Sequence, residues 1–144
     1  MAENFESKRA PEPVGAFPHA KRVSDLLFLS GIGPRARGSK EIPGVTLDSS
    51  GNVTTYDIET QCRAVFENVR LVLEDAGATW NDIIDVTVFL TNMKKDFAPY
   101  NKSYAEYFAG RGKPNPTRTT IEVGALPTPI AIELKVIAYL GRGD

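Results

Sequence analysis

One arginine and one glutamate near the end of the chain stand in segments that otherwise have the composition of buried strands. Arg118 lies in residues 117–123 and Glu133 in residues 130–140, and residues 124–129 between them contain a glycine and two prolines that interrupt strands and helices. An arginine can grip a carboxylate through two hydrogen bonds, and a glutamate can take a proton from water and return it. If the two strands lie side by side, both side chains could enter one cavity. A cross-strand ion pair without a catalytic role would explain the same two residues.

The alternation of side chains along a strand places further residues beside this pair. Arg118, Thr120 and Glu122 share one face of the first segment. In the second segment an apolar stripe leaves Glu133 and Lys135 on the opposite face. The stripe consists of Ile130, Ile132, Leu134, Val136 and Ala138.

The hydrophobic pattern also predicts the elements that position these residues. Apolar side chains recur at three- and four-residue intervals over residues 56–76 and 96–109, which predicts two helices. They alternate over residues 83–91, which predicts a strand, and two short runs at 20–23 and 26–30 predict a hairpin. If both helices cover one face of the sheet, the other face is uncovered in a monomer, and we expect Arg118 and Glu133 on that uncovered face.

Length and composition limit the class of protein. With 144 residues and 42% hydrophobic content, the chain predicts one compact domain at residues 14–144, preceded by a polar, flexible N-terminal arm at residues 1–13. The net charge is −1 with acids and bases mixed, which disfavours nucleic-acid binding. No membrane span or secretory signal is apparent, which predicts a cytoplasmic protein. One cysteine and one histidine predict neither a disulfide nor a metal site.

The run R-T-T-I-E-V-x-x-L-P, followed by I-E, resembles the closing signature of the RidA family, also called YjgF or L-PSP. Residues 14–20 (VGAFPHA) resemble the opening turn of that family, residues 26–34 (LLFLSGIGP) its second strand, and residues 86–108 its strand and helix. Within the family, the segments IPGVTLD and SGIGPRAR are most similar to the 2-aminomuconate deaminase branch. The members are small trimeric enamine and imine deaminases, although some are labelled ribonucleases.

The resemblance implies an α+β fold with a mixed six-stranded sheet and two main helices on one face. It also implies a homotrimer whose three sheets form a central barrel, with sites between the subunits. The implied substrate is a small imino or enamino acid, and the scheme requires no cofactor.

The matched positions imply roles for individual residues. Arg118 would clamp the substrate carboxylate, and Glu133 would deprotonate the attacking water and return the proton to departing ammonia. Thr120 replaces a cysteine of many relatives, which argues against covalent catalysis. The substrate-binding residues implied by the resemblance are Phe17, Ser30, Gly31, Asn101 and Thr120. Phe17 and His19 replace the tyrosine and glutamine usual in the family, and we leave His19 outside the catalytic set.

The long loop at residues 33–50 contains cations that bear on the substrate. A dicarboxylate such as 2-aminomuconate needs a second cation, which Arg35 or Arg37 could supply, although the loop could equally be a solvated surface. The sequence therefore predicts a 2-aminomuconate deaminase that forms 4-oxalocrotonate and ammonia in the breakdown of aromatic compounds. Two alternatives stay open: a general 2-imino acid deaminase of the housekeeping type, and a non-enzymatic 2-oxo acid-binding module.

Overall fold

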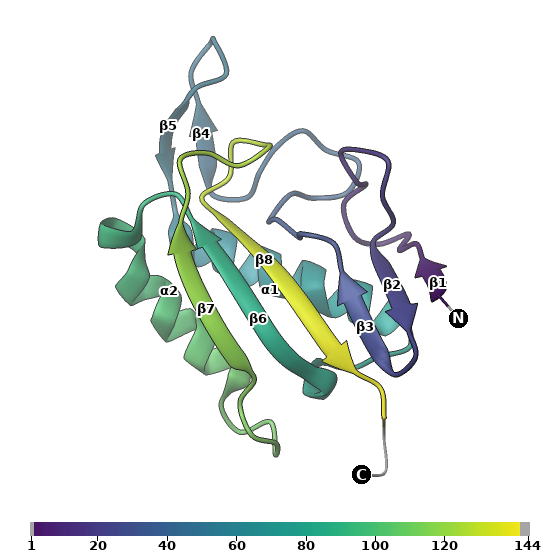
Figure 1. The fold of residues 1–144 in the computed structure, drawn as a ribbon. Coiled ribbons are helices and arrows are strands. Elements are labelled where there is room, and N and C mark those ends of the chain that lie inside the picture. Colours follow the sequence, from purple (N-terminus) through teal and green to yellow (C-terminus); the bar gives the residue numbers. More distant parts are fainter. Residues whose placement is uncertain (1, 142–144) are drawn as a thin grey trace.

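Six strands form one mixed sheet in the computed structural model, which describes residues 2–141. The strand order across the sheet is β1-β2-β3-β8-β6-β7, with β6 and β7 parallel and the other neighbours antiparallel (Figure 1). The strand bounds are β1 Ala2–Phe5, β2 Ala20–Val23, β3 Leu26–Leu29, β6 Ile83–Leu90, β7 Thr117–Glu122 and β8 Ile132–Tyr139.

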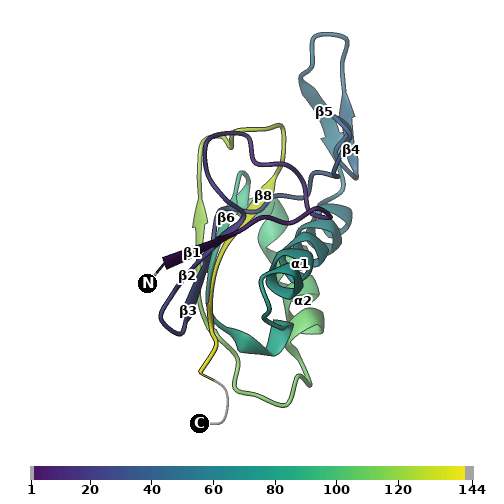
Figure 2. The ribbon, with the colours of Figure 1, turned by 90° about the vertical axis from the view of Figure 1, so that its right-hand side faces the viewer.

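Both long helices lie on the same face of this sheet, as Figure 2 shows. They are α1 (Ile58–Asp75) and α2 (Met93–Phe108), and a short 3-10 helix at Trp80–Asp82 precedes β6. The described residues contain no helix on the opposite face, which we call the open face. This architecture confirms the α+β fold with a six-stranded mixed sheet and two helices on one side.

Helix α1 confirms the helix that the apolar periodicity predicts at residues 56–76. Asp57 caps its N-terminus by accepting a hydrogen bond from the Glu59 backbone N–H, and Gly77 follows its end with a φ of 83°. The apolar stripe is buried against the sheet. Its buried members are Ile58, Cys62, Val65, Phe66, Val69, Val72 and Leu73.

Helix α2 begins earlier than the expected residue 96. Its cap is Asn92, whose side chain accepts a hydrogen bond from the Lys95 backbone N–H, so Pro99 lies inside the helix rather than in its first turn. The earlier start brings Asp96 into the buried part of the helix, where its carboxylate accepts a hydrogen bond of 2.6 Å from Tyr56.

A two-stranded hairpin interrupts the loop that was expected at residues 33–50. Strands β4 (Val45–Leu47) and β5 (Val53–Tyr56) pair antiparallel and project beyond the six-stranded sheet (Figure 1). Asp48 accepts hydrogen bonds from the backbone of Ser50 and Asn52, which fixes the turn between the strands.

The N-terminal residues differ from the expected flexible arm. Residues 2–5 form β1 on the edge of the sheet, and residues 7–14, which we call the N-terminal strap, pack on the domain with Ala10 fully buried. His19 accepts a hydrogen bond from the Ser7 backbone N–H and donates to the Pro11 carbonyl. Arg37 donates to two further strap carbonyls. These long-range bonds explain why a polar segment is held in place, and Met1 lies outside the described residues.

Candidate active site

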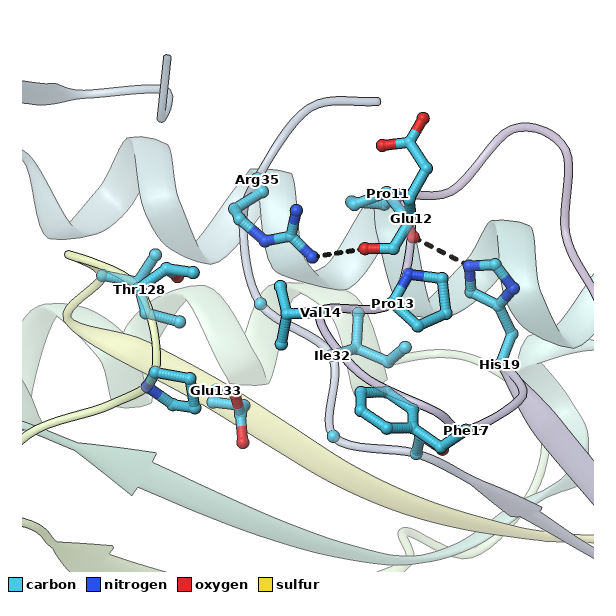
Figure 3. A pocket seen from close by; sticks show the side chains of 15 residues that line it. Pro11, Glu12, Pro13, Val14, Phe17, His19, Ile32, Arg35, Thr128 and Glu133 are labelled. Carbon is cyan, nitrogen blue, oxygen red and sulfur yellow. Dashed lines mark hydrogen bonds between the residues drawn. The ribbon is translucent and has the colours of Figure 1, made fainter. Parts of the chain in front are cut away.

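A cavity of about 190 Å³ lies between the N-terminal strap, the end of β3 and the start of β8. Figure 3 shows Glu133 of β8 below Arg35, and the strap residues Glu12 and Val14 are among the other residues that line the cavity. Of the residues predicted from the sequence, Phe17, Ser30, Gly31, Arg35 and Glu133 all line this cavity.

Glu133 is the acid–base candidate within the cavity. Its neighbours Ile132 and Leu134 are fully buried under the helices, so Glu133 points to the open face, as alternation predicts. Burial raises the pKa of Glu133, and the positive charge of Arg35 opposes that rise. Within residues 2–141 the structure gives this carboxylate no hydrogen-bond donor, so both of its oxygens remain able to accept a proton from water.

Gly31 brings the backbone close to that carboxylate. A Cβ atom at position 31 would lie 2.7 Å from Oε2 of Glu133, which is closer than real Cβ atoms approach an oxygen. Glycine is therefore the residue that lets the carboxylate occupy this position.

Ser30 and Phe17 shape the same wall. The Ser30 hydroxyl donates a hydrogen bond of 2.7 Å to the Pro18 carbonyl, which leaves its oxygen as an acceptor toward the cavity. Phe17 is 41% exposed and offers an apolar ring.

Arg118 does not enter this cavity within one chain. Strand β7 pairs with β6, and β8 lies on the far side of β6, so the two segments that carry Arg118 and Glu133 are not neighbours. Arg118 is aligned with the fully buried Val86 and faces the helices, whereas Glu133 faces away from them. The expectation that both residues lie on the uncovered face and share one cavity is therefore wrong for a single chain.

Arg118 belongs to a second cluster at the edge of the sheet. Its guanidinium donates a hydrogen bond of 2.8 Å to the Asn101 side-chain oxygen and lies 4.7 Å from the centre of the Tyr104 ring. Thr120 is on the same face of β7, and its Oγ1 lies 2.8 Å from the Tyr100 hydroxyl. This cluster unites Arg118, Asn101 and Thr120 of the predicted set, and the edge of β7 leaves it open to a neighbouring molecule.

Arg37 and His19 make hydrogen bonds that hold the N-terminal strap. Arg37 donates to the Ser7 and Ala10 carbonyls at 3.0 and 2.8 Å and does not line the cavity. His19 borders the cavity, but both of its ring nitrogens bond to the strap. Arg35 is therefore the loop arginine that can reach a ligand beside Glu133, while its Nη2 also donates to the Glu12 carbonyl at 2.7 Å.

Tyr100 and Tyr104 were not among the predicted site residues. Both lie beneath Arg118, at ring-centre distances of 5.3 and 4.7 Å. The four-residue spacing of two tyrosines around Asn101 on a predicted helix was the available signal. It marks a helical face, and the partner strand could not be known from the sequence.

Among residues 2–141, no group of three or more histidine, cysteine, aspartate or glutamate residues is placed to hold a metal ion. No helix in the same range is long and apolar enough to cross a membrane.

Comparison with known proteins identifies relatives over almost the full length. The family model described as Endoribonuclease L-PSP matches residues 7–140. A RutC family protein of Pyrococcus horikoshii is 39% identical over 140 residues, which cover 96% of this chain and 98% of the relative. TdcF of Escherichia coli, a proposed reactive intermediate deaminase, is 31% identical over 96% of this chain and 97% of its own.

Solved structures of similar proteins share the fold of this chain. The crystal structure of E. coli TdcF with bound serine has a TM-score of 0.81 at 31% identity, and covers 95% of this chain and 98% of that one. The YjgF gene product of E. coli has a TM-score of 0.80 at 27% identity, with coverage of 95% and 98%.

Proposed function

The chain belongs to the L-PSP family, also called RidA or YjgF, and we propose that it is a deaminase that hydrolyses 2-imino acids and their enamine tautomers to 2-oxo acids and ammonia. The observation that carries the proposal is Glu133, a half-buried carboxylate with a raised pKa that receives no hydrogen bond from residues 2–141 and lies in a cavity large enough for a small acid. None of the relatives described above is named for 2-aminomuconate, so the general 2-imino acid is the proposed substrate class.

The reaction needs one base that also serves as an acid. Glu133 takes a proton from water as the water oxygen forms a bond to the C=N carbon, and the imine nitrogen becomes an amine. The protonated Glu133 gives that proton to the nitrogen, which completes the amine. Glu133 then takes the proton of the new hydroxyl and passes it to the amine as the C–N bond breaks, so the hydroxyl oxygen becomes the C=O of the 2-oxo acid and ammonia leaves. The sum is imino acid plus water to 2-oxo acid plus ammonia.

The substrate carboxylate requires a cation. The candidate is Arg118, which lies on the opposite face of the sheet from Glu133. We place Arg118 of one subunit opposite Glu133 of its neighbour in a homotrimer, so that each site draws on two subunits. Two features support this placement. The Arg118 cluster lies at an unpaired sheet edge, and the open face exposes apolar side chains such as Ile121 and Val23 that need a cover.

A dicarboxylate substrate such as 2-aminomuconate is a second candidate, favoured by one observation. Arg35 lines the cavity beside Glu133, and its charge is close enough to lower the pKa of that residue. A second carboxylate in the cavity could therefore pair with Arg35. A monocarboxylate has no need for this contact.

Turnover distinguishes the enzyme from a protein that only binds 2-oxo acids. An L-amino acid oxidase generates the imino acid in place, and semicarbazide traps the part that has not been hydrolysed. A deaminase at catalytic concentration lowers the yield of semicarbazone, and Glu133→Gln restores it. An unchanged yield with the wild-type protein would leave only the binding function.

A further inference from the structure

A buried hydroxyl pair lies directly behind the Arg118 cluster. Tyr100 on α2 is fully buried, and its hydroxyl lies 2.8 Å from Oγ1 of Thr120 on β7. Its ring also lies beneath Arg118, 5.3 Å from the guanidinium carbon. One tyrosine thus contacts both β7 residues that are expected to hold the substrate carboxylate.

The direction of this hydrogen bond follows from the available acceptors. Each hydroxyl carries one proton. Within residues 2–141, Thr120 is the one acceptor that the structure gives the Tyr100 proton, and a buried proton without an acceptor is unfavourable. Thr120 is only half-buried, so its own proton can point out of the protein. Burial raises the pKa of Tyr100, so the phenol keeps its proton at neutral pH.

We propose that Tyr100 is a positioning residue that donates its hydrogen bond to Thr120 and thereby directs the Thr120 proton toward the substrate carboxylate. This inference rests on the proposed deaminase function. The carboxylate then receives a hydrogen bond from the Thr120 hydroxyl beside the bonds from Arg118. Because Tyr100 donates to Thr120, the Thr120 hydroxyl is free to donate its own proton to an anion. If Thr120 donated to Tyr100 instead, its oxygen would present a lone pair to the carboxylate and repel it.

Substitution of Tyr100 by phenylalanine tests the contribution of the hydroxyl group alone. Tyr100→Phe keeps the ring beneath Arg118 and removes only the group that orients Thr120. We expect the KM for a 2-imino acid and the Kd for pyruvate to rise by about 3- to 10-fold, with little change in kcat, because one hydrogen bond to a ground-state carboxylate loses its fixed direction.

A double-mutant cycle tests whether the tyrosine acts through Thr120. The four proteins are wild type, Tyr100→Phe, Thr120→Val and the double variant, and pyruvate binding is measured by calorimetry. In the Thr120→Val background, Tyr100→Phe should add no further weakening of pyruvate binding, because the hydroxyl that it orients is already absent. Thr120→Ser, which keeps a hydroxyl, should weaken pyruvate binding less than Thr120→Val does. Tyr107→Phe on the same helix, which packs against Phe66 and Trp80 away from β7, is the matched control.

The outcomes separate this inference from the proposed function. Independent effects of the two substitutions, or a Tyr100→Phe variant that is folded and binds pyruvate as wild type does, overturn the positioning role while imine turnover stands. The expected cycle without turnover overturns the deaminase function and keeps the positioning role in a binding module. Absence of both turnover and pyruvate binding in the wild-type protein overturns both.

Discussion

Gly31→Ala is a substitution whose effect can be worked from a single contact. The added methyl group would lie 2.7 Å from Oε2 of Glu133, so the carboxylate must move by about 0.7 Å to reach an ordinary contact of 3.4 Å. The obstructed atom is the end of a flexible side chain, so the fold can accommodate the change. A misplacement approaching 1 Å of a catalytic group can cost about 10²-fold, and we expect a loss of about 10- to 100-fold in kcat/KM, or about 1.4–2.7 kcal/mol.

The assay for Gly31→Ala pairs kinetics with thermal unfolding. The unfolding free energy should change by only about 1 kcal/mol, because alanine also restricts the unfolded chain. Gly124→Ala is the matched control, since its φ is outside the left-handed region and its Cβ would meet no atom within 4 Å. A folded Gly31→Ala variant with kcat/KM within about 3-fold of wild type would refute the argument that the position of Glu133 limits the reaction.

The further predictions concern the charged residues. Glu133→Gln should lower kcat by about 10²-fold or more with little change in KM; a rise in KM alone would make Glu133 a binding residue. Because burial raises the pKa of Glu133, wild-type kcat/KM should fall as the pH drops through that raised pKa, and Glu133→Gln should lack this limb. The folded state then binds this proton more tightly than the unfolded state. The stability of wild type relative to Glu133→Gln should therefore decrease as pH rises from the ordinary glutamate pKa through the raised one, which urea unfolding at a series of pH values would measure. Arg118→Lys should raise KM by about 10-fold or more without altering the molecular mass in light scattering, because lysine lacks the planar two-point contact; normal KM would remove Arg118 from the site. Arg35→Ala should weaken turnover of a dicarboxylate more than that of a monocarboxylate, whereas Arg37→Ala should lower the melting temperature and spare this ratio; equal losses on both substrates would exclude a second-carboxylate site at Arg35.

Local patterns in the sequence were sufficient for individual elements and faces. Helix α1 follows from its three- and four-residue apolar spacing, and Arg118 and Thr120 share a face of β7 because side chains alternate. The family signature then supplied the sheet and its two helices. The predicted pocket residues were expected in one site, whereas one chain places them in two: Phe17, Ser30, Gly31, Arg35 and Glu133 line the β3–β8 cavity, and Arg118, Asn101 and Thr120 gather at β7.

Strand order and long-range hydrogen bonds could not be predicted from these local patterns. Alternation cannot show that β6 lies between β7 and β8, which separates Arg118 from Glu133, or that the helices cover the face of β7 that carries Arg118. The N-terminal strap has a polar, proline-containing sequence typical of disorder, yet His19 and Arg37 hold it through backbone carbonyls and an N–H that no local pattern reveals. In both cases the deciding partner lies far away in the sequence.

Subunit complementation tests the proposed shared site most directly. Chains carrying Arg118→Ala and chains carrying Glu133→Gln, each inactive alone, are mixed in equal amounts under conditions that exchange subunits. If every site uses Arg118 of one subunit and Glu133 of the next, random assembly restores about one quarter of the sites. A mixture of wild type with the doubly substituted chain is the control: it retains about one quarter of the sites if they are shared and about one half if each lies within one chain. Recovery of about a quarter of wild-type imine turnover is the result we predict, and activity that stays at the level of the separate variants, with exchange verified, would contradict a site shared between subunits.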